Sequence, residues 1–189
     1  MGRWEPNAHD RLQRAAMELF RERGYDRTTV EEIAARAGLT ERTFFRYFND
    51  KREVLFSGSK ALETIIVGAI AAAPPATAPL DAVAAGLEAT ASSFEERRTH
   101  ARERRALVVE HAELRERELI KLSSLASAIA ESLRARGVAK PTASLVAEAG
   151  IAIFKSAFER WIEDVEEHDL AHHVRATLAE LRLATGSRR

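Results

Sequence analysis

Hydrophobic residues recur along this chain at intervals of three and four, the spacing that places them on one face of an α-helix. Gly, Pro, Thr and Asp residues, which commonly begin or end helices, separate these stretches. No segment has the pattern of a β-hairpin. The sequence therefore predicts an all-α protein with about nine helices. The predicted helices cover residues 10–23, 30–37, 41–47, 50–72, 79–97, 99–110, 112–136, 141–166 and 169–184.

Capping signals delimit the first four of these helices. Thr29 and Glu32 have the Ser/Thr-x-x-Glu spacing, in which a hydroxyl and a carboxylate satisfy each other's backbone N–H groups. Thr40 and Asp50 are expected to cap the third and fourth helices, and Gly38 to end the second. The short helices in front and the larger helical body behind predict two domains, at residues 1–56 and 57–189.

The second and third predicted helices have the size and the Gly-Leu-Thr turn of a helix-turn-helix. Phe44 and Phe48 lie four residues apart on the third helix and are expected to pack inward. The opposite face then carries arginines beside an aromatic residue, which suits a helix lying in the major groove of DNA. The residues on that face are Arg42, Thr43, Arg46 and Tyr47.

Composition and charge agree with this interpretation. Hydrophobic residues make up 46% of the chain and charged residues 31%, which is a globular balance. The formal net charge is zero, but residues 36–52 contain five basic and two acidic residues, so this window carries 5 − 2 = +3. There is no Cys, so disulfides and thiolate chemistry are excluded. The N-terminus does not have the pattern of a secretory signal, and the apolar run 65–76 is short and interrupted for a membrane span. We expect a cytoplasmic protein that does not bind membranes.

The stretch TTVEEIAARAGLTERTFFRYFNDKREVL, Thr28 to Leu55, preceded by AMELFRERGYDR, closely resembles the TetR/AcrR family of bacterial regulators. The resemblance covers about a third of the chain and is specific as an ordered series of residues. It implies that the recognition helix enters the groove, where several residues approach bases or the DNA backbone. These residues are Thr40, Glu41, Arg42, Thr43, Phe45 and Arg46.

The resemblance further implies phosphate contacts around the recognition helix. Tyr47 and Lys51 would hold phosphates, and Thr28 and Thr29 lie at the amino end of the second helix, where the helix dipole favours an anion. Arg3 could reach phosphates from the N-terminal arm. Simpler explanations exist for some of these residues: Thr29 and Thr40 cap helices regardless of DNA, and Arg42, Arg46 and Lys51 could form an ordinary solvated face.

Position 45 departs from the family. Phe45 stands where the family often has Tyr, so a phenolic phosphate contact would be replaced by an apolar contact, for example with a thymine methyl.

Wide apolar stripes on the last two helices predict a homodimer, as the family forms. The apolar stripe of the eighth helix is wider than one neighbouring helix would cover. The ninth helix has a single row of apolar residues, which suits packing against a partner helix. The alternative is that both stripes belong to the core of one chain. The residues predicted for the dimer interface are Phe154, Phe158, Trp161, Val174, Leu178 and Leu181.

The helical body should enclose an apolar cavity for a small-molecule effector, but the sequence does not locate its lining. The aromatic and aliphatic candidates are more simply explained as core. They are Phe94, Leu107, His111, Leu125, Phe154, Phe158 and Trp161.

No catalytic, cofactor or metal site is expected. Asp164, His168 and His172 would align on a continuous helix, but the predicted break near residues 168–169 spoils that register. We therefore predict a regulator, most simply a repressor, that binds a pseudo-palindromic operator in double-stranded DNA as a dimer. A small apolar or amphiphilic effector would release it. The alternatives are an activator with the same fold, a helical protein–protein adaptor, and a helical enzyme whose nucleophile or metal the sequence does not reveal.

Overall fold

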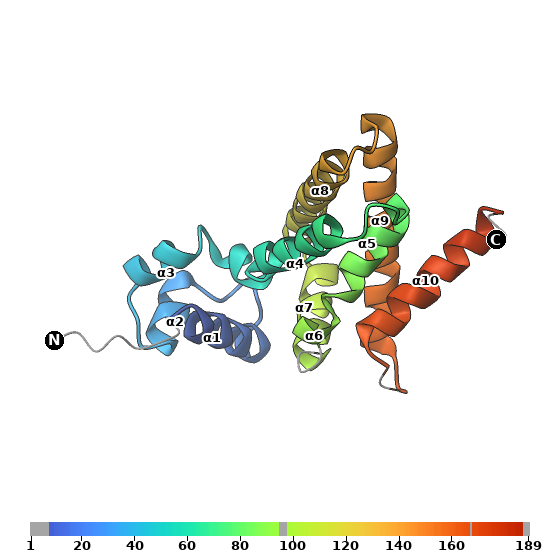
Figure 1. Ribbon diagram of the computed structural model, residues 1–189. Coiled ribbons are helices and arrows are strands. Elements are labelled where there is room, and N and C mark those ends of the chain that lie inside the picture. The colour runs from blue at the N-terminus through green and yellow to red at the C-terminus, as the bar shows by residue number, and fades with distance from the viewer. Residues whose placement is uncertain (1–7, 95–97, 167, 187–189) are drawn as a thin grey trace. The chain divides into compact units, whose positions relative to one another are not determined.

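The computed structural model describes residues 8–94, 98–166 and 168–186, and within them it contains helices and no strand (Figure 1). The chain divides into two compact units between Gly58 and Ser59. The N-terminal unit contains α1 (Ala8–Arg23), α2 (Val30–Arg36), α3 (Glu41–Tyr47) and a 3-10 helix, η1 (Lys51–Phe56). The C-terminal unit contains α4 (Ser59–Ala72), α5 (Pro79–Glu88), α6 (Ala91–Phe94), α7 (Arg98–Glu110), α8 (Ala112–Ala135), α9 (Lys140–Glu163) and α10 (Leu170–Ala184).

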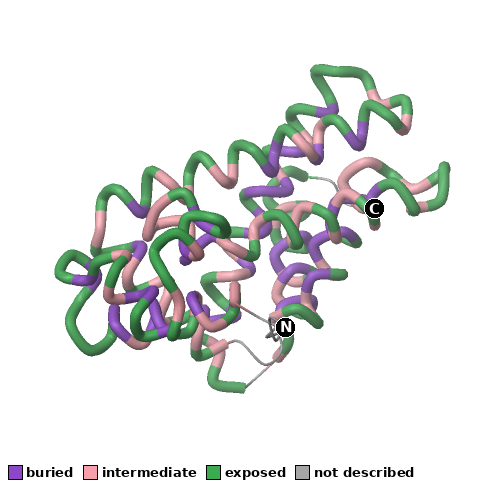
Figure 2. The backbone as a smooth tube through the Cα atoms, turned by 90° about the vertical axis from the view of Figure 1, so that its left-hand side faces the viewer, coloured by how far each residue is buried: buried purple, intermediate pink, exposed green. Residues whose placement is uncertain are grey.

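In the N-terminal unit, α1 packs on α2 and η1, and α2 packs on α3. The side chains of Ile33 in α2, Phe44 in α3 and Val54 in η1 are fully buried, as is Leu12 on the apolar face of α1. Buried and exposed positions are interspersed along the helical backbone, as Figure 2 shows, and in α1 the buried residues recur at helical spacing. The helical period read from the sequence is therefore the period that forms the core of this unit.

Capping side chains hold the N-terminal helices in the predicted places. Thr29 and Glu32 form the capping box: the Thr29 hydroxyl accepts from the Glu32 N–H at 3.2 Å, and the Glu32 carboxylate accepts from the Thr29 N–H at 2.9 Å. Thr40 caps α3, and the Asp50 carboxylate accepts from two N–H groups of η1. Gly38 has a φ of 66°, a left-handed conformation that lets the chain turn from α2 into α3.

In the C-terminal unit, α5 packs against α4, α9 and α10, while α8 packs against α4, α7 and α9. Close helix crossings depend on glycine. A Cβ at Gly150 of α9 would lie 2.5 Å from Cγ1 of Val83 on α5, which is closer than two carbons can approach. Arg136, after the end of α8, donates to the carbonyls of Ile70 and Ala73 and so satisfies acceptors at the end of α4.

Two predicted helices are interrupted in the structure. The fourth divides into η1 and α4 at Ser57–Gly58, and the fifth divides into α5 and α6. At the second break, both the hydroxyl and the N–H of Thr90 donate to the Leu87 carbonyl, at 2.6 and 3.1 Å, which tightens the turn and ends α5.

One helical stretch in the described part of the chain, Lys51–Ala72, is long and apolar enough to meet the criteria for a membrane span, with a mean hydropathy of 1.5. This stretch changes from a 3-10 helix to an α-helix on its way. Val54, Leu55 and Phe56 in its first part and Ile66 and Ile70 in its second are buried in the protein itself. The core helices of proteins without a membrane span meet the same criteria.

Candidate nucleic-acid interface

The exposed face of α3 carries the residues expected to meet DNA. Phe44 is fully buried, and this orientation turns Glu41, Arg42, Phe45 and Arg46 toward solvent. Phe45 is 53% exposed, and its ring stands edge-on to Phe44 with 5.5 Å between the ring centroids. An apolar ring held out in this way loses its water contacts only if a partner covers it.

Arginines on this face keep their charge available. Arg42 has no hydrogen bond or ion pair to any residue in the described ranges. Arg46 interacts with its neighbour Tyr47, whose ring centroid lies 5.0 Å from the guanidinium carbon and whose hydroxyl lies 3.3 Å from Nη2. Neither arginine therefore contacts an acid among the described residues, so the guanidinium groups of Arg42 and Arg46 can both donate to a phosphate or to a base edge.

Other basic groups of the +3 window are already paired. Arg36 bonds to Glu22 at 2.8 Å and lies 3.5 Å from Glu18, and Arg52 bonds to Asp50 at 2.6 Å. The hydrogen bond from Arg36 lowers the pKa of Glu22, so this exposed ion pair persists at neutral pH. Of the other three basic residues of the window, Arg42 and Arg46 lie exposed on α3 and Lys51 lies at the start of η1.

Lys51 is engaged within the protein. Its ammonium donates to three backbone carbonyls, of Tyr25 at 2.9 Å, Asp26 at 3.3 Å and Thr28 at 3.1 Å, and it lies 4.3 Å from the centroid of the Tyr25 ring. An ammonium has three donors, so the phosphate contact predicted for Lys51 would require it to leave one of these carbonyls.

The two threonines before α2 differ from each other. Thr28 is 1% exposed and its hydroxyl donates to the Gly24 carbonyl at 2.9 Å, so its side chain is engaged within the N-terminal unit, and its DNA contact stays a prediction. Thr29 is exposed at the amino end of α2 but is occupied by the capping box with Glu32. The Thr40 and Thr43 hydroxyls likewise lie 3.1 Å apart, with Thr40 capping α3.

Sequence reasoning missed His9 at the beginning of α1. The centroid of its ring lies 5.0 Å from that of Phe48 and 6.2 Å from that of Tyr47, so His9 packs against the end of α3. No periodic signal distinguishes this histidine, because the contact joins residues far apart in the sequence. Arg3, predicted to reach phosphates, lies outside the described residues.

The residues predicted for the dimer interface lie mainly in the interior of a single chain. Four of the six residues are buried within the core of a single chain, with Trp161 1% exposed and Val174 0% exposed, so they have almost no surface left for a partner. Only Phe158 and Leu181 are partly exposed. The alternative, that the two stripes form an intramolecular core, explains them: α9 and α10 use them to pack on each other and on α5.

Candidates for the effector pocket also lie mainly in packed surroundings. Leu125, Phe154 and Trp161 are buried in the core cluster, and Phe94 and Phe158 pack on it, each ring within 6 Å of the Trp161 ring. The described structure identifies no lining for an effector at these positions.

Comparison with known proteins agrees with the geometry in both units. The profile of bacterial regulatory proteins of the tetR family matches residues 12–57, and the profile of the MftR C-terminal domain matches residues 77–185. The regulator TcmR of Streptomyces glaucescens is 40% identical over 74 residues, which cover 39% of this chain and one third, 33%, of that protein. The mycofactocin biosynthesis regulator MftR of Mycobacterium tuberculosis is 25% identical over 167 residues, or 87% of this chain and 84% of that protein.

A solved structure of Thermus thermophilus FadR, described as a TetR-family repressor in complex with lauroyl-CoA, is also similar. The two sequences are 26% identical, the match covers 90% of this chain and 91% of the FadR chain, and the TM-score is 0.53. The family and the fold of these matches are those of DNA-binding transcription regulators. The chain belongs to the TetR family of bacterial transcription regulators.

Proposed function

We propose that this protein is a ligand-responsive repressor that binds a pseudo-palindromic operator as a homodimer in the cytoplasm. The observation that carries the proposal is the exposed face of α3, where two arginines without acidic partners flank an exposed phenylalanine. A solvated helix gains nothing from exposing that ring, whereas the major groove offers base edges and thymine methyl groups to both kinds of side chain.

The proposed contacts follow from what each side chain leaves free. Arg42 and Arg46 would donate to base edges or phosphates, and Phe45 would pack on a thymine methyl. The Tyr47 hydroxyl would reach a phosphate, and Thr29 would approach the DNA backbone at the amino end of α2. Lys51 is not retained among the direct contacts, because its three donors are used within the protein. Glu41, Thr40 and Thr43 begin the recognition helix and lie beside these contacts.

For the dimer we propose the outer faces of α9 and α10. Leu145 of α9 is 73% exposed, and Leu183 of α10 is 72% exposed. Each of these helices also has an exposed alanine, Ala152 in α9 and Ala179 in α10. Small exposed residues let two helices approach closely, and an isolated monomer gains nothing from two exposed leucines at such positions. A two-fold axis would then present two recognition helices to successive major grooves about 34–36 Å apart.

The proposed effector is a small amphiphile, which would bind the C-terminal unit and favour a dimer whose recognition helices no longer match the operator. The FadR relative is described in complex with lauroyl-CoA, an amphiphile with a long acyl chain, which supports this chemical class. A coupling free energy of about 1–3 kcal/mol would weaken operator binding by about 5- to 150-fold.

Operator selection from random duplex DNA, followed by binding titrations, tests the proposal. Arg42→Ala should weaken binding to the selected duplex by about 5- to 150-fold, as loss of one good base contact does, and should relax preference at one base pair of each half-site. Arg134→Ala is the matched control: it removes the same charge from α8 of the C-terminal unit, where Arg134 lies 3.4 Å from Glu131. Failure to select any duplex, or equal losses in the two variants, would refute DNA reading by α3 and favour a protein–protein adaptor.

A further inference from the structure

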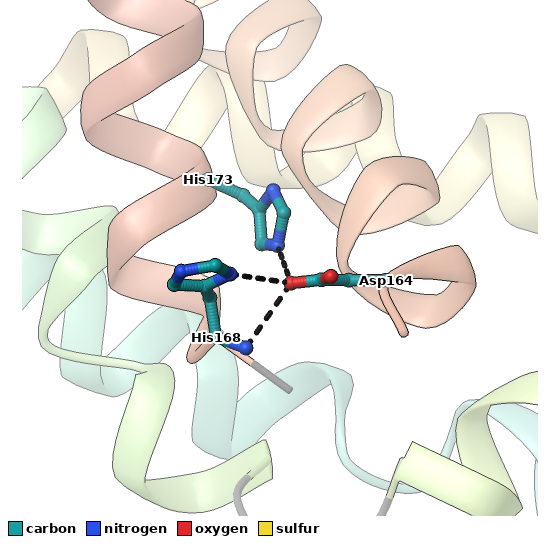
Figure 3. Close-up of side chains that lie close together, drawn as sticks. All are labelled: Asp164, His168 and His173. Carbon is teal, nitrogen blue, oxygen red and sulfur yellow. Dashed lines mark hydrogen bonds and ion pairs between the residues drawn. The ribbon is translucent and has the colours of Figure 1, made fainter. Parts of the chain in front are cut away.

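Three side chains at the connection between α9 and α10 converge on one point. Asp164 directly follows α9, His168 lies in the connection, and His173 is in the first turn of α10. Figure 3 shows both imidazole rings directed at the same oxygen of Asp164: Oδ2 lies 3.0 Å from His168 Nδ1 and 2.9 Å from His173 Nε2. All three potential ligand atoms lie within 4.8 Å of one another.

Hydrogen bonding accounts for this cluster incompletely. Besides the two ring nitrogens, Oδ2 faces the His168 N–H at 3.1 Å, so three donors compete for the two lone pairs of one oxygen. The other oxygen, Oδ1, accepts only the Glu166 N–H, at 2.8 Å, among the bonds of the described residues. A metal cation would replace these competing hydrogen bonds, because it can take one lone pair from each imidazole and one from the carboxylate oxygen at the same time.

We propose that Asp164, His168 and His173 form a binding site for a divalent transition-metal ion of the zinc class. Two imidazole nitrogens and one carboxylate oxygen are ligands that Zn²⁺ prefers, and three protein ligands leave a fourth position for water. In a tetrahedral site with bonds of about 2.0–2.1 Å, ligand atoms lie about 3.3 Å apart. The oxygen–nitrogen separations of 2.9 and 3.0 Å therefore need to open by only a few tenths of an ångström.

The surroundings favour metal binding. The side chains of Asp164 and His173 are only 10% and 13% exposed, so burial limits their alternative rotamers, while His168 at 39% leaves a path for an ion from solvent. Arg98 donates to the carbonyls of Asp164 and His168 and so holds the backbone on both sides of the site.

This inference concerns the connection between two helices and does not depend on operator binding. Bound metal would join the end of α9 to the start of α10 and stabilise the folded chain. Binding uses the neutral tautomers in which His168 carries its hydrogen on Nε2 and His173 carries its hydrogen on Nδ1, so that His168 Nδ1 and His173 Nε2 each donate a lone pair to the cation. A ring that is protonated on both nitrogens releases one proton to water when it binds the metal.

The test uses full-length protein without a histidine tag, cleared of metal with a chelator and titrated with Zn²⁺ by calorimetry and with Co²⁺ by visible absorption. We expect one ion per chain, visible d–d bands from Co²⁺, and a melting temperature raised by about 5–11 °C at a zinc concentration one hundred times Kd. His168→Ala and His173→Ala should each weaken binding at least tenfold.

His172→Ala is the matched control. His172 stacks on His168 with 4.1 Å between ring centroids, but it is not among the groups that face Asp164. Binding should survive its removal. The proposal is overturned if the wild-type chain takes up no stoichiometric zinc, if His168→Ala binds as the wild type does, or if His172→Ala loses as much affinity as the other two. Because His168 is half-buried, its variant should fold even if His173→Ala does not, and circular dichroism without metal checks this.

Discussion

Replacing Lys51 with Ala separates two roles that one ammonium group could have. In the structure it donates to the carbonyls of Tyr25, Asp26 and Thr28 and lies over the Tyr25 ring, which ties the start of η1 to the segment between α1 and α2. In the alternative, predicted from the family resemblance, it binds a DNA phosphate. The first role predicts loss of stability, and the second predicts a changed dependence of DNA affinity on salt.

The magnitude follows from these contacts. A hydrogen bond from a charged donor contributes about 1.5–3 kcal/mol, but three bonds from one half-buried ammonium are not additive, and water replaces part of them. We expect Lys51→Ala to lower the free energy of unfolding of the N-terminal unit by about 2 kcal/mol. For a unit of 58 residues, Met1–Gly58, this corresponds to a melting temperature lower by about 8–16 °C.

Thermal unfolding and salt-dependent DNA titrations measure both roles on the same variant. The titrations are made well below the melting temperature, so that the N-terminal unit stays folded. Lys60→Ala is the control, since that lysine is 81% exposed and contacts only Glu63 at i+3 among the described residues. An unchanged melting temperature, together with a slope of log affinity against log salt that is shallower by about 1 per subunit, would show that the ammonium neutralises phosphate instead.

Four further variants test the fold and the proposed dimer interface. The hydrogen bond from the Thr29 N–H lowers the pKa of Glu32 in the folded state. The ionised carboxylate therefore stabilises the fold fully above the unfolded-state pKa, and this stabilisation is lost as the pH falls through the folded-state pKa. Glu32→Gln should remove this loss of stability at acid pH, as measured by unfolding curves from pH 7 to pH 2. Gly150→Ala should cost about 1–3 kcal/mol in chemical denaturation, because its Cβ would meet Val83. Leu178→Glu should unfold the chain, whereas Ala179→Glu should leave a folded monomer by sedimentation; a folded Leu178→Glu chain would contradict its placement in the core.

Local signals in the sequence predicted what depends on neighbours along the chain. The capping box of Thr29 and Glu32 and the left-handed Gly38 are properties of a few consecutive residues, and they lie where the sequence placed them. The spacing of Phe44 and Phe48 likewise sufficed to orient α3, since burying one face of a seven-residue helix exposes the other. The exposed half of the candidate DNA interface could therefore be predicted.

Contacts between distant segments could not be predicted in the same way. The stripe containing Trp161 and Val174 shows that these side chains are buried but does not name the surface that buries them, and the chain's own core does so. The histidines show the same limit. A continuous helix would align His172 with Asp164, but the helix ends there and begins again at Leu170, and this change of register brings His173 to the carboxylate instead.

Charge distribution explains how a neutral chain can read DNA. The sequence has 29 basic and 29 acidic residues, so its long-range attraction to DNA is weak, and screening confines what remains to about 8–10 Å at ordinary salt. Within residues 36–52, Arg36 and Arg52 are paired with acids of their own unit, whereas Arg42, Arg46 and Lys51 have no acidic partner among the described residues. Lys51 is held by backbone carbonyls, which leaves the two arginines as the exposed cations of α3. On a non-specific duplex the proposed base contacts of α3 would be absent, and these few cations would release few counterions. Binding to such a duplex would therefore be weak. With the proposed contacts, such a neutral regulator would have a low affinity for non-specific DNA, and its affinity for an operator would depend on the side chains of α3 that are proposed to meet base edges.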